Sequence, residues 1–292
     1  MKLFSGLEQI VKLDEPMAGH TWLGIGGPAE YFLQPENIEQ LQTVVLRCRQ
    51  SDVPIHVLGS GANLLVNDRG VPGAVIHFGK GGFTGVTWLG ETLKAGAGAD
   101  MGKIVLQTAR KGLSGMECLT GIPGSVGGCV RMNAGGAFGD IGSIVETVDV
   151  MNSAGDCFTR HRTDLAFAYR STNISATFIL GAEFKLTEDD PYTILQQIKR
   201  IWIYKKNTQP LGHSSCGCIF KNPRGLSAGA LIDRAGLKGK RVGGAFVSEK
   251  HANFILADRA ATASDVLKLI DIVRRTVYEK HEVYLELEIE VW

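Results

Sequence analysis

The sequence contains no uninterrupted apolar run of the roughly 18 residues that a membrane-spanning helix needs. Residues 1–16 mix charges at helical spacing, which disfavours a secretion signal. An excess of one charge is also missing, because 31 Lys and Arg residues stand against 30 Asp and Glu residues. Such a balance does not indicate a nucleic-acid surface. We therefore expect a cytoplasmic protein with no nucleic-acid partner and no membrane partner.

Cysteines are few and lack the regular spacing of a disulfide framework. The six are Cys48, Cys118, Cys129, Cys157, Cys216 and Cys218, and this scatter is typical of reduced cytosolic thiols. Cys216 and Cys218 have only His213 close by, and two thiolates with one imidazole do not complete a tetrahedral zinc site. We expect no bound metal, and whether Cys216 and Cys218 ever pair stays open.

The mixed periodicity of the chain predicts an α+β protein, and 292 residues allow two or three domains. Helical spacing predicts helices over residues 36–52, 101–111, 192–206, 227–235 and 264–281. Short apolar or alternating segments predict strands at 54–59, within 75–97, and at 143–152, 177–186, 244–247, 252–257 and 283–292. Pro210 stops the helix that precedes it, so a second domain is expected to begin near residue 207.

Glycine is abundant, with 37 residues, and it is concentrated in segments 24–29, 58–66 and 121–136. Glycine loops let main-chain N–H groups converge on an anion, and a helix that starts after such a loop adds its positive end. Ordinary tight turns would explain any single loop, but three in one chain favour a phosphate-bearing cofactor. None of the three has the spacing of a Rossmann fingerprint or of a P-loop.

The same loops, with several longer motifs, resemble the UDP-N-acetylenolpyruvoylglucosamine reductase family. The matching segments run in the family's order through GIGGPAEYF, LGSGANLL, GIPGSVGG, MNAGG, YRST, GCIFKNP, HANFI and LELEIEV. The resemblance implies a two-lobed FAD-binding domain of the vanillyl-alcohol-oxidase-like (PCMH) type and a smaller α+β substrate-binding domain. We expect FAD-binding lobes at residues 1–73 and 74–206 and the substrate domain at 207–292, with the last strand returning to the active site. The short interval between Tyr169 and the following strand suggests the subtype without the long inserted substrate loop.

The resemblance also implies a flavoprotein oxidoreductase of peptidoglycan synthesis, and so of cell wall biogenesis, cell shape and cell division. NADPH would reduce FAD and leave. The enolpyruvyl group of UDP-N-acetylglucosamine enolpyruvate would then accept the hydride and a proton, giving UDP-N-acetylmuramate. We expect a monomer whose partners are NADPH and this UDP-sugar.

Three catalytic residues follow from the resemblance, because the reaction needs a cation, a hydrogen-bonded acid and a proton donor. Arg170 would bind the substrate carboxylate with its forked guanidinium, as an alternative to a surface salt bridge. Glu288 would stabilise the enol form, although an alternating strand places Glu286, Glu288 and Glu290 on one face and spacing alone does not choose among them. The commonest family pattern has serine as proton donor where this chain has Cys218. A thiol, with a pKa of about 8.5, can also protonate an enolate.

Binding residues are implied in the same way. For FAD they are Gly59, Ser60, Gly61, Ala62, Asn63, Leu64, Leu65, Gly121, Pro123, Gly124, Ser125, Gly127, Gly128, Asn133 and Ala134. For the UDP-sugar they are Tyr169, Lys206 and Asn222, with Lys221 and His251 as weaker candidates. We expect His251 to be a packed structural residue.

Two other functions remain open from sequence. One is an FAD-dependent sugar or alcohol oxidase of the same fold, which the GCIFKNP and HANFI segments argue against. The other is a non-catalytic nucleotide-sugar-binding relative, which the retention of Arg170, Glu288 and a protic group at Cys218 argues against.

Overall fold

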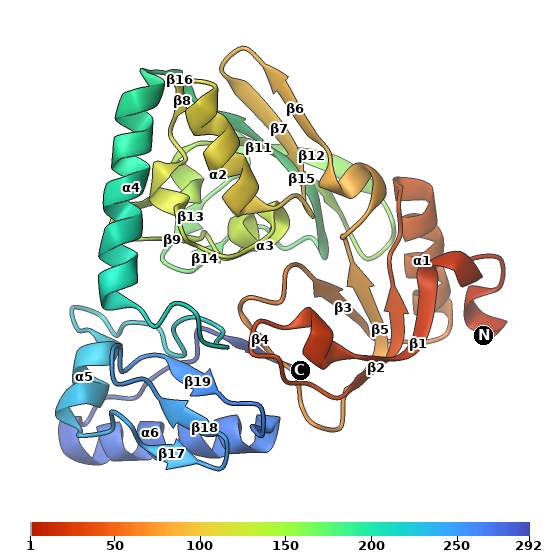
Figure 1. Ribbon diagram of the computed structural model, residues 1–292. Coiled ribbons are helices and arrows are strands. Elements are labelled where there is room, and N and C mark those ends of the chain that lie inside the picture. Colours follow the sequence, from red (N-terminus) through yellow and green to blue (C-terminus); the bar gives the residue numbers. More distant parts are fainter. Residues whose placement is uncertain (1) are drawn as a thin grey trace. The chain divides into compact units, whose positions relative to one another are not determined.

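The chain folds as two units, each assembled from segments that lie far apart in the sequence (Figure 1). The structure, a computed structural model, describes residues 2–292. The first unit comprises residues up to 13, residues 30–60 and residues 72–204. The second unit comprises residues 14–29, 61–71 and 205–292.

A five-stranded antiparallel sheet forms the larger layer of the first unit. Its strand order is β12 (Cys157–His161), β11 (Val145–Met151), β15 (Phe178–Lys185), β7 (Thr92–Gly96) and β6 (Val86–Leu89). The same part of the chain contains helices α2 (Met101–Arg110), α3 (Val126–Arg131) and α4 (Pro191–Thr208). Asp100 caps α2 by accepting from the Lys103 N–H group, and the apolar side chains of α2 are buried in the same core as those of β11 and β15.

A four-stranded sheet carries the N-terminal part of the chain. Its order is β1 (Val11–Pro16), β2 (Pro28–Leu33), β5 (Val71–His77) and β3 (Ile55–Leu58), and β3 runs parallel to β5. Helix α1 (Ile38–Gln50) precedes β3 and is capped by Asn37. Its buried face is Leu41, Val44, Val45 and Cys48, as the helical spacing predicts.

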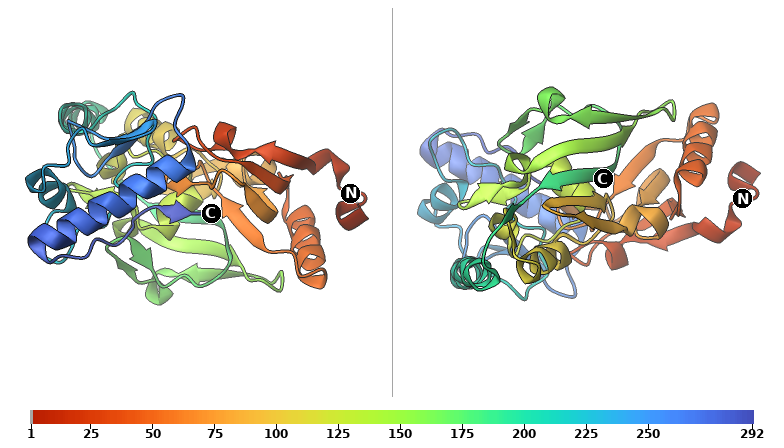
Figure 2. Two further views of the ribbon diagram at one scale, coloured as in Figure 1. Left: turned by 90° about the horizontal axis from the view of Figure 1, so that it is seen from below. Right: turned by 90° about the horizontal axis from the view of Figure 1, so that it is seen from above.

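The second unit contains α5 (Ala228–Arg234), α6 (Ala263–His281) and the sheet β17 (Arg241–Val242), β18 (Ala245–Val247), β19 (Ile255–Ala257). A capping box between Thr262 and Asp265 starts α6. The C-terminal segment runs beside α6 (Figure 2), where the Arg274 side chain donates to the Leu285 carbonyl at 3.1 Å. Apolar side chains of α5, α6 and the sheet form one buried cluster.

The remaining elements are short. They are the strands β4 (Leu64–Leu65), β8 (Leu113–Ser114), β9 (Gly135–Gly136), β10 (Gly139–Asp140), β13 (Phe167–Ala168), β14 (Ser171–Thr172), β16 (Thr187–Glu188) and β20 (Glu290–Val291), and the 3-10 helices Lys2–Phe4, Glu8–Ile10, Met17–His20, Gly81–Thr84, Glu117–Leu119, Ile141–Ser143 and Arg162–Asp164. All five predicted helices are present. The predicted C-terminal strand is shorter than expected, because only Glu290 and Val291 pair continuously, in parallel with β4. Before them only Leu287 forms a bridge, to Phe220.

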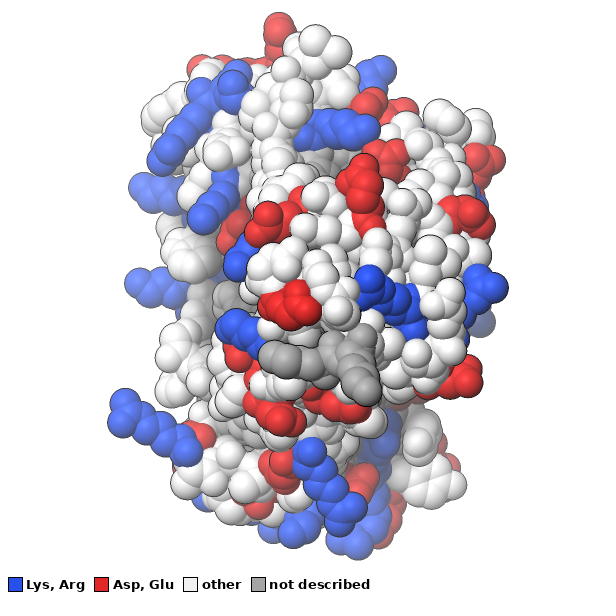
Figure 3. Space-filling model, turned by 90° about the vertical axis from the view of Figure 1, so that its right-hand side faces the viewer, with Lys and Arg blue, Asp and Glu red and all other residues white. Residues whose placement is uncertain are grey.

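Charged side chains of both signs are interspersed on the face drawn in Figure 3, in line with the balanced composition. Within residues 2–292, no helix is long and apolar enough to cross a bilayer. The same residues contain no cluster of three or more His, Cys, Asp or Glu side chains that could hold a metal ion.

Candidate active site

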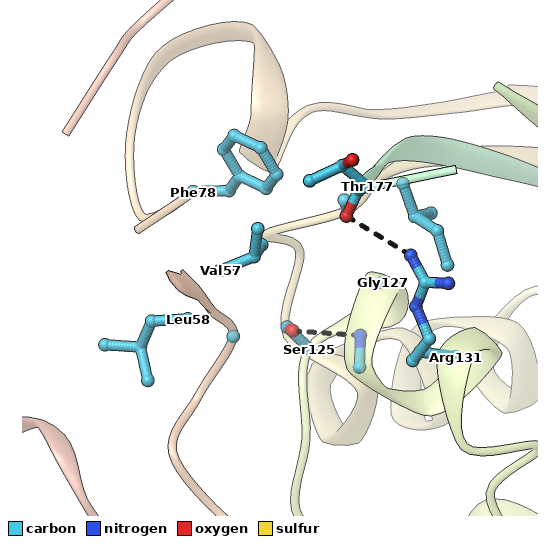
Figure 4. A pocket seen from close by; sticks show the side chains of 11 residues that line it. Val57, Leu58, Phe78, Ser125, Gly127, Arg131 and Thr177 are labelled. Atoms are coloured by element: carbon cyan, nitrogen blue, oxygen red, sulfur yellow. Dashed lines mark hydrogen bonds between the residues drawn. The ribbon is translucent and has the colours of Figure 1, made fainter. Parts of the chain in front are cut away.

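Two adjoining pockets lie in the first unit, at the end of β3, and Figure 4 shows the first of them. Each has a volume of about 110 Å³, and they share Leu58, Gly59, Phe78 and Ser125. Apolar side chains form much of the wall of the first pocket. The second pocket adds the polar groups of Ser60, His77 and Asp100. The pockets therefore join an apolar slot to a polar edge.

Glycines bring the chain close together around these pockets. A Cβ atom at Gly59 would lie 2.6 Å from the Ser125 Oγ atom, and one at Gly127 would lie 2.9 Å from the Cβ atom of Ala97. A Cβ atom at Gly98 would come within 1.5 Å of the Phe78 carbonyl oxygen. Side chains at these three positions would fill the space or displace the main chain that surrounds it.

The first turn of α3 uses its N–H groups within the protein. Val126 donates to the Ala99 carbonyl at 3.0 Å, and Gly127 donates to the Ala97 carbonyl at 2.8 Å. The Gly128 N–H group faces the Ser125 side chain at 3.5 Å. These glycines thus allow close packing at the pocket, and the main chain at Gly59 and Ser60 is the better candidate for anion contact.

Arg131 closes one side of the first pocket. Its guanidinium donates to the carbonyl oxygens of Ile174, Ala176 and Thr177, at 2.5, 2.6 and 3.3 Å, and Figure 4 shows the bond to Thr177. Burial lowers the pKa of this guanidinium. Arg131 therefore fixes the loop that leads into β15 and adds a positive charge to the pocket wall.

Arg170 lies at the tip of the β13–β14 hairpin in an unusual main-chain conformation. Its φ angle is +54°, a region that costs a residue with a Cβ atom free energy. Its guanidinium lies over the Tyr169 ring, 5.1 Å from the centroid, and Tyr169 is exposed. A tight turn often places its second central residue in this region, so the φ angle of Arg170 follows from the turn that joins β13 to β14.

The side chain of Asn133 is hydrogen-bonded to the β13 strand of that hairpin. Its side chain is 3% exposed, donates to the Ala168 carbonyl at 3.0 Å and accepts from the Gly142 N–H group at 3.0 Å. The amide predicted to contact the cofactor is therefore engaged with the main chain two residues before Arg170.

In the second unit, the segments that carry Cys218 and Glu288 are joined directly. The Glu288 N–H group donates to the carbonyl oxygen of Ile219, the residue after Cys218, at 2.8 Å. Glu288 and Cys218 are both half-buried, whereas Glu286 is 70% exposed in its side chain and lies 3.7 Å from Lys221. Glu290 is exposed as well. Burial thus separates Glu288 from the two other acids on the segment, which the spacing of the sequence did not.

The neighbouring cysteine has a different environment. Cys216 is 1% exposed, and burial raises the pKa of its thiol to about 12. Because Cys216 is buried and Cys218 is half-buried, Cys218 is the thiol of this pair that a substrate can reach.

The loop of residues 61–65 also belongs to the second unit. Asn63 donates from its side chain to the Glu288 carbonyl at 3.0 Å. Leu64 and Leu65 are buried in β4, paired with β20. Gly61, at a φ angle of +68°, passes so close to His20 that a Cβ atom would lie 2.0 Å from the His20 carbonyl oxygen.

The predicted sugar contacts lie in the second unit except for Tyr169. Lys206 is exposed near the end of α4, and its carbonyl accepts a hydrogen bond from the Lys250 side chain. Asn222 accepts from the Ala228 N–H group at 3.0 Å, at the start of α5. His251 packs edge-on against Phe254 at 4.9 Å, and burial lowers the pKa of its imidazole.

The structure brings only part of the predicted cofactor set to the two pockets. Those that line them are Gly59, Ser60, Gly124, Ser125, Gly127 and Gly128. Lining residues that sequence reasoning missed are Val57, Leu58, His77, Phe78, Ala97, Gly98, Asp100, Arg131, Thr177 and Ile179. The alternating GAGA at residues 96–99 was an available signal, because small residues there permit the close approach to Phe78 and Gly127.

The pockets fit the chemistry of FAD. A flavin ring needs a flat apolar slot with polar groups at its edge, and a diphosphate needs main-chain donors beside glycine. Val57, Leu58, Phe78 and Ile179 supply the apolar surface, and Gly59 with Ser60 supplies the glycine main chain.

Comparisons with known proteins show the family of the chain. A profile for an FAD binding domain matches residues 29–159, and a profile for the C-terminal domain of UDP-N-acetylenolpyruvoylglucosamine reductase matches residues 209–292. The chain is 42% identical to the UDP-N-acetylenolpyruvoylglucosamine reductase of Desulfosudis oleivorans, with 96% of this chain and 94% of that protein covered. It is 40% identical to the enzyme of that name from Lachnoclostridium phytofermentans, with 96% and 92% covered.

Solved structures give the same result. The crystal structure of UDP-N-acetylenolpyruvylglucosamine reductase from Thermus caldophilus matches with a TM-score of 0.84 and 40% identity, covering 97% of this chain and 98% of that one. A glucose dehydrogenase, Phl p 4.0202, shares the fold alone, with a TM-score of 0.51 and 13% identity over 95% of this chain and 59% of that one. The expected two-lobed FAD-binding fold is confirmed. The chain belongs to the UDP-N-acetylenolpyruvoylglucosamine reductase family.

Proposed function

We propose that this enzyme reduces the enolpyruvyl group of UDP-N-acetylglucosamine enolpyruvate to the lactyl group of UDP-N-acetylmuramate, with NADPH as electron source and Cys218 as proton donor. The observation that carries this proposal is the hydrogen bond between Glu288 and Ile219, which ties an acid and a protic side chain to one strand pair. Family membership gives the reductase activity, the FAD cofactor and the place in peptidoglycan precursor synthesis.

FAD, when bound, supplies the transfer of hydride from NADPH to the substrate carbon. The first unit would hold this group through the apolar walls at Val57, Phe78 and Ile179 and through the main chain at Gly59 and Ser60. These apolar walls would also exclude water from the pocket.

The remaining chemistry belongs to three side chains. Addition of hydride to the vinyl carbon leaves negative charge on the carboxylate-bearing carbon, and a fixed cation stabilises such charge. Arg170 binds the substrate carboxylate, and Glu288 stabilises the enol form by hydrogen bonding. Cys218 donates the proton from its Sγ atom, which completes the saturation of the double bond.

Other assignments extend this proposal. Tyr169, Lys206 and Asn222 contact the UDP-sugar, and the FAD-binding lobes span residues 1–73 and 74–206 before the substrate domain at 207–292. Gly61, Ala62, Gly121, Pro123 and Ala134 remain among the proposed flavin contacts. The enzyme acts as a monomer in the cytoplasm.

Two half-reactions test the proposal. Purified protein should be yellow, its flavin absorbance should fall on addition of NADPH without oxygen (the NADPH half-reaction), and it should return on addition of the enolpyruvyl sugar (the sugar half-reaction). Return of the absorbance in air alone, with no effect of the sugar, would instead identify an oxidase. Protein that binds the sugar but no flavin would identify a non-catalytic binding protein.

A further inference from the structure

The side-chain amide of Asn253 pairs with the main chain of Phe220, two residues after Cys218. Its Oδ1 atom accepts from the Phe220 N–H group at 3.0 Å, and its Nδ2 atom donates to the Phe220 carbonyl at 2.8 Å. The main-chain carbonyl of Asn253 also accepts from the Ile219 N–H group, at 2.9 Å. One asparagine thus makes three hydrogen bonds to two consecutive residues of the Cys218 segment.

The opposite edge of the same segment is bonded to the Glu288 segment. The Ile219 carbonyl accepts from Glu288 at 2.8 Å, and the Lys221 N–H group donates to Glu286 at 2.9 Å. Residues 219–221 are therefore held from both sides, with Asn253 on one side and residues 286–288 on the other.

Asn253 acts here in place of a neighbouring strand. Cys218 forms a bridge to Phe254, but the Phe254 N–H group turns back to the His251 carbonyl at 2.9 Å. The main chain beside β19 therefore no longer runs along Phe220. An asparagine side chain contains the same donor and acceptor as a peptide group, so it continues the pairing beyond the point where the strand turns away.

The loop that carries Asn253 is itself fixed. The Ser248 side chain accepts from the N–H groups of Lys250 and His251, at 3.2 and 3.3 Å, and the Ser248 N–H group donates to the Phe254 carbonyl at 2.9 Å. Asn253 is 3% exposed, and Phe220 is 1% exposed. Loss of the amide would leave two buried main-chain groups without these partners, which a protein tolerates poorly.

We infer that Asn253 is a positioning residue for the sugar half-reaction, acting through the main chain of Phe220 to hold Cys218 at the reacting carbon. The inference rests on the proposed proton-donor role of Cys218. Proton transfer depends steeply on geometry, because a displacement of about 1 Å can slow a positioned step about 100-fold. A flavin that exchanges hydride with NADPH does not need this proton donor, so the two half-reactions should respond differently.

The test compares Asn253→Ala with Asp68→Ala. Asp68 accepts three hydrogen bonds from Ala263 and Ser264 at the start of α6, so its loss also removes side-chain hydrogen bonds from the second unit, here near its surface, without touching residues 218–220. Asn253→Ala should slow the sugar half-reaction about 100-fold at saturating sugar, with the NADPH half-reaction within about 2-fold of the parent protein. Asp68→Ala should leave both rates within about 2-fold. Equal rates in Asn253→Ala and the parent would overturn the inference.

A double variant separates positioning from a general loss of structure. In a Cys218→Ala background the added Asn253→Ala change should cost nothing further in the sugar half-reaction, because the group that Asn253 positions is already gone. Additive losses would overturn the inference and indicate a merely structural role. Asn253→Gln keeps both the donor and the acceptor of the amide on a longer side chain, and it serves if Asn253→Ala does not fold, with a smaller loss expected in the same half-reaction. If the parent enzyme does not react with the sugar at all, the proposed function is wrong. That result differs from a failure of the inference about Asn253.

Discussion

A hydrogen bond joins Asn63 and Glu288, which lie 225 positions apart in the sequence: the Asn63 side chain donates to the Glu288 carbonyl at 3.0 Å. The main-chain carbonyl of Asn63 also accepts from the Glu290 N–H group at 2.9 Å. The glycine-rich loop that the sequence assigns to the cofactor therefore also holds the segment of Glu288, the residue proposed to stabilise the enol form. Both residues belong to the second unit.

Replacement of Asn63 by Ala should loosen the Glu288 segment. We expect the free energy of unfolding to fall by about 1 kcal/mol, because a partly buried carbonyl loses its donor. The sugar half-reaction should slow by about 10-fold, whereas the affinity for FAD should stay within about 2-fold. Chemical unfolding and flavin titration measure these effects. A loss of FAD affinity without any change in the sugar half-reaction would assign Asn63 to the cofactor instead.

Arg170 allows strain and function to be separated. Arg170→Ala and Arg170→Gly both remove the guanidinium, but only glycine relieves the φ angle of +54°. The glycine variant should therefore be more stable than the alanine variant by about 1 kcal/mol. Both should lose the sugar half-reaction to the same extent, about 100-fold or more, since the carboxylate loses its cation.

A matched control for this pair exists at Asp52, which has a φ angle of +51° and is exposed after α1. Asp52→Gly should raise stability slightly and leave both half-reactions unchanged. Thermal unfolding measures the stability of these variants, and stopped-flow absorbance measures the rates of their two half-reactions. An alanine variant at Arg170 with normal sugar kinetics would remove Arg170 from the active site.

Cys218 should be required for the sugar half-reaction and not for the NADPH half-reaction. Cys218→Ala is expected to slow the sugar half-reaction by about 100- to 10,000-fold, the range for loss of a general acid, with the NADPH half-reaction intact. Cys218→Ser should retain activity, since a hydroxyl is also a proton donor. Cys216→Ala is the control, because that thiol is buried and out of reach of a substrate. Equal losses in the two half-reactions of Cys218→Ala would contradict the proton-donor role.

Local patterns sufficed for the helices and for the family, but contacts across long sequence separations did not follow from them. The spacing at α1 and α6 predicts their buried faces because both lie along one helix surface. In contrast, the partners of Asn63 and Asn133 lie 225 and 35 positions away. Each asparagine sits in a glycine loop and was assigned to the cofactor, since a loop amide gives no sign of whether its partner is a ligand or a distant main chain. Likewise, alternation along one strand does not choose between Glu288 and Glu286; the family resemblance selects Glu288, and the burial of the two residues supports that choice.

Gly59 should control the width of the flavin pocket. An Ala side chain there would place its Cβ atom 2.6 Å from the Ser125 Oγ atom, with no adverse φ angle, so the effect is one of space. We expect Gly59→Ala to weaken FAD binding about 10-fold with little loss of stability. Adding Ser125→Ala should restore part of the affinity, because the clashing oxygen is removed. Gly136→Ala, where no atom lies within 4 Å of the new Cβ, should change nothing. Failure of the second change to restore binding would show that Gly59 acts through its main chain.

Asp68 should make the stability of the second unit depend on pH. Burial opposes its ionisation, but hydrogen bonds from the Ser264 hydroxyl and from the N–H groups of Ala263 and Ser264 outweigh burial, so the pKa of this carboxyl is lowered. A group whose pKa is lower in the folded state stabilises that state above its unfolded pKa of about 3.9, and the contribution is lost as the pH falls through the folded value. Asp68→Asn should therefore be less stable than the parent at pH 7, and the gap should narrow as the pH drops below about 4. Urea unfolding of both proteins across this range measures the gap. A gap that stays constant with pH would show that the carboxylate does not stabilise α6 through its charge.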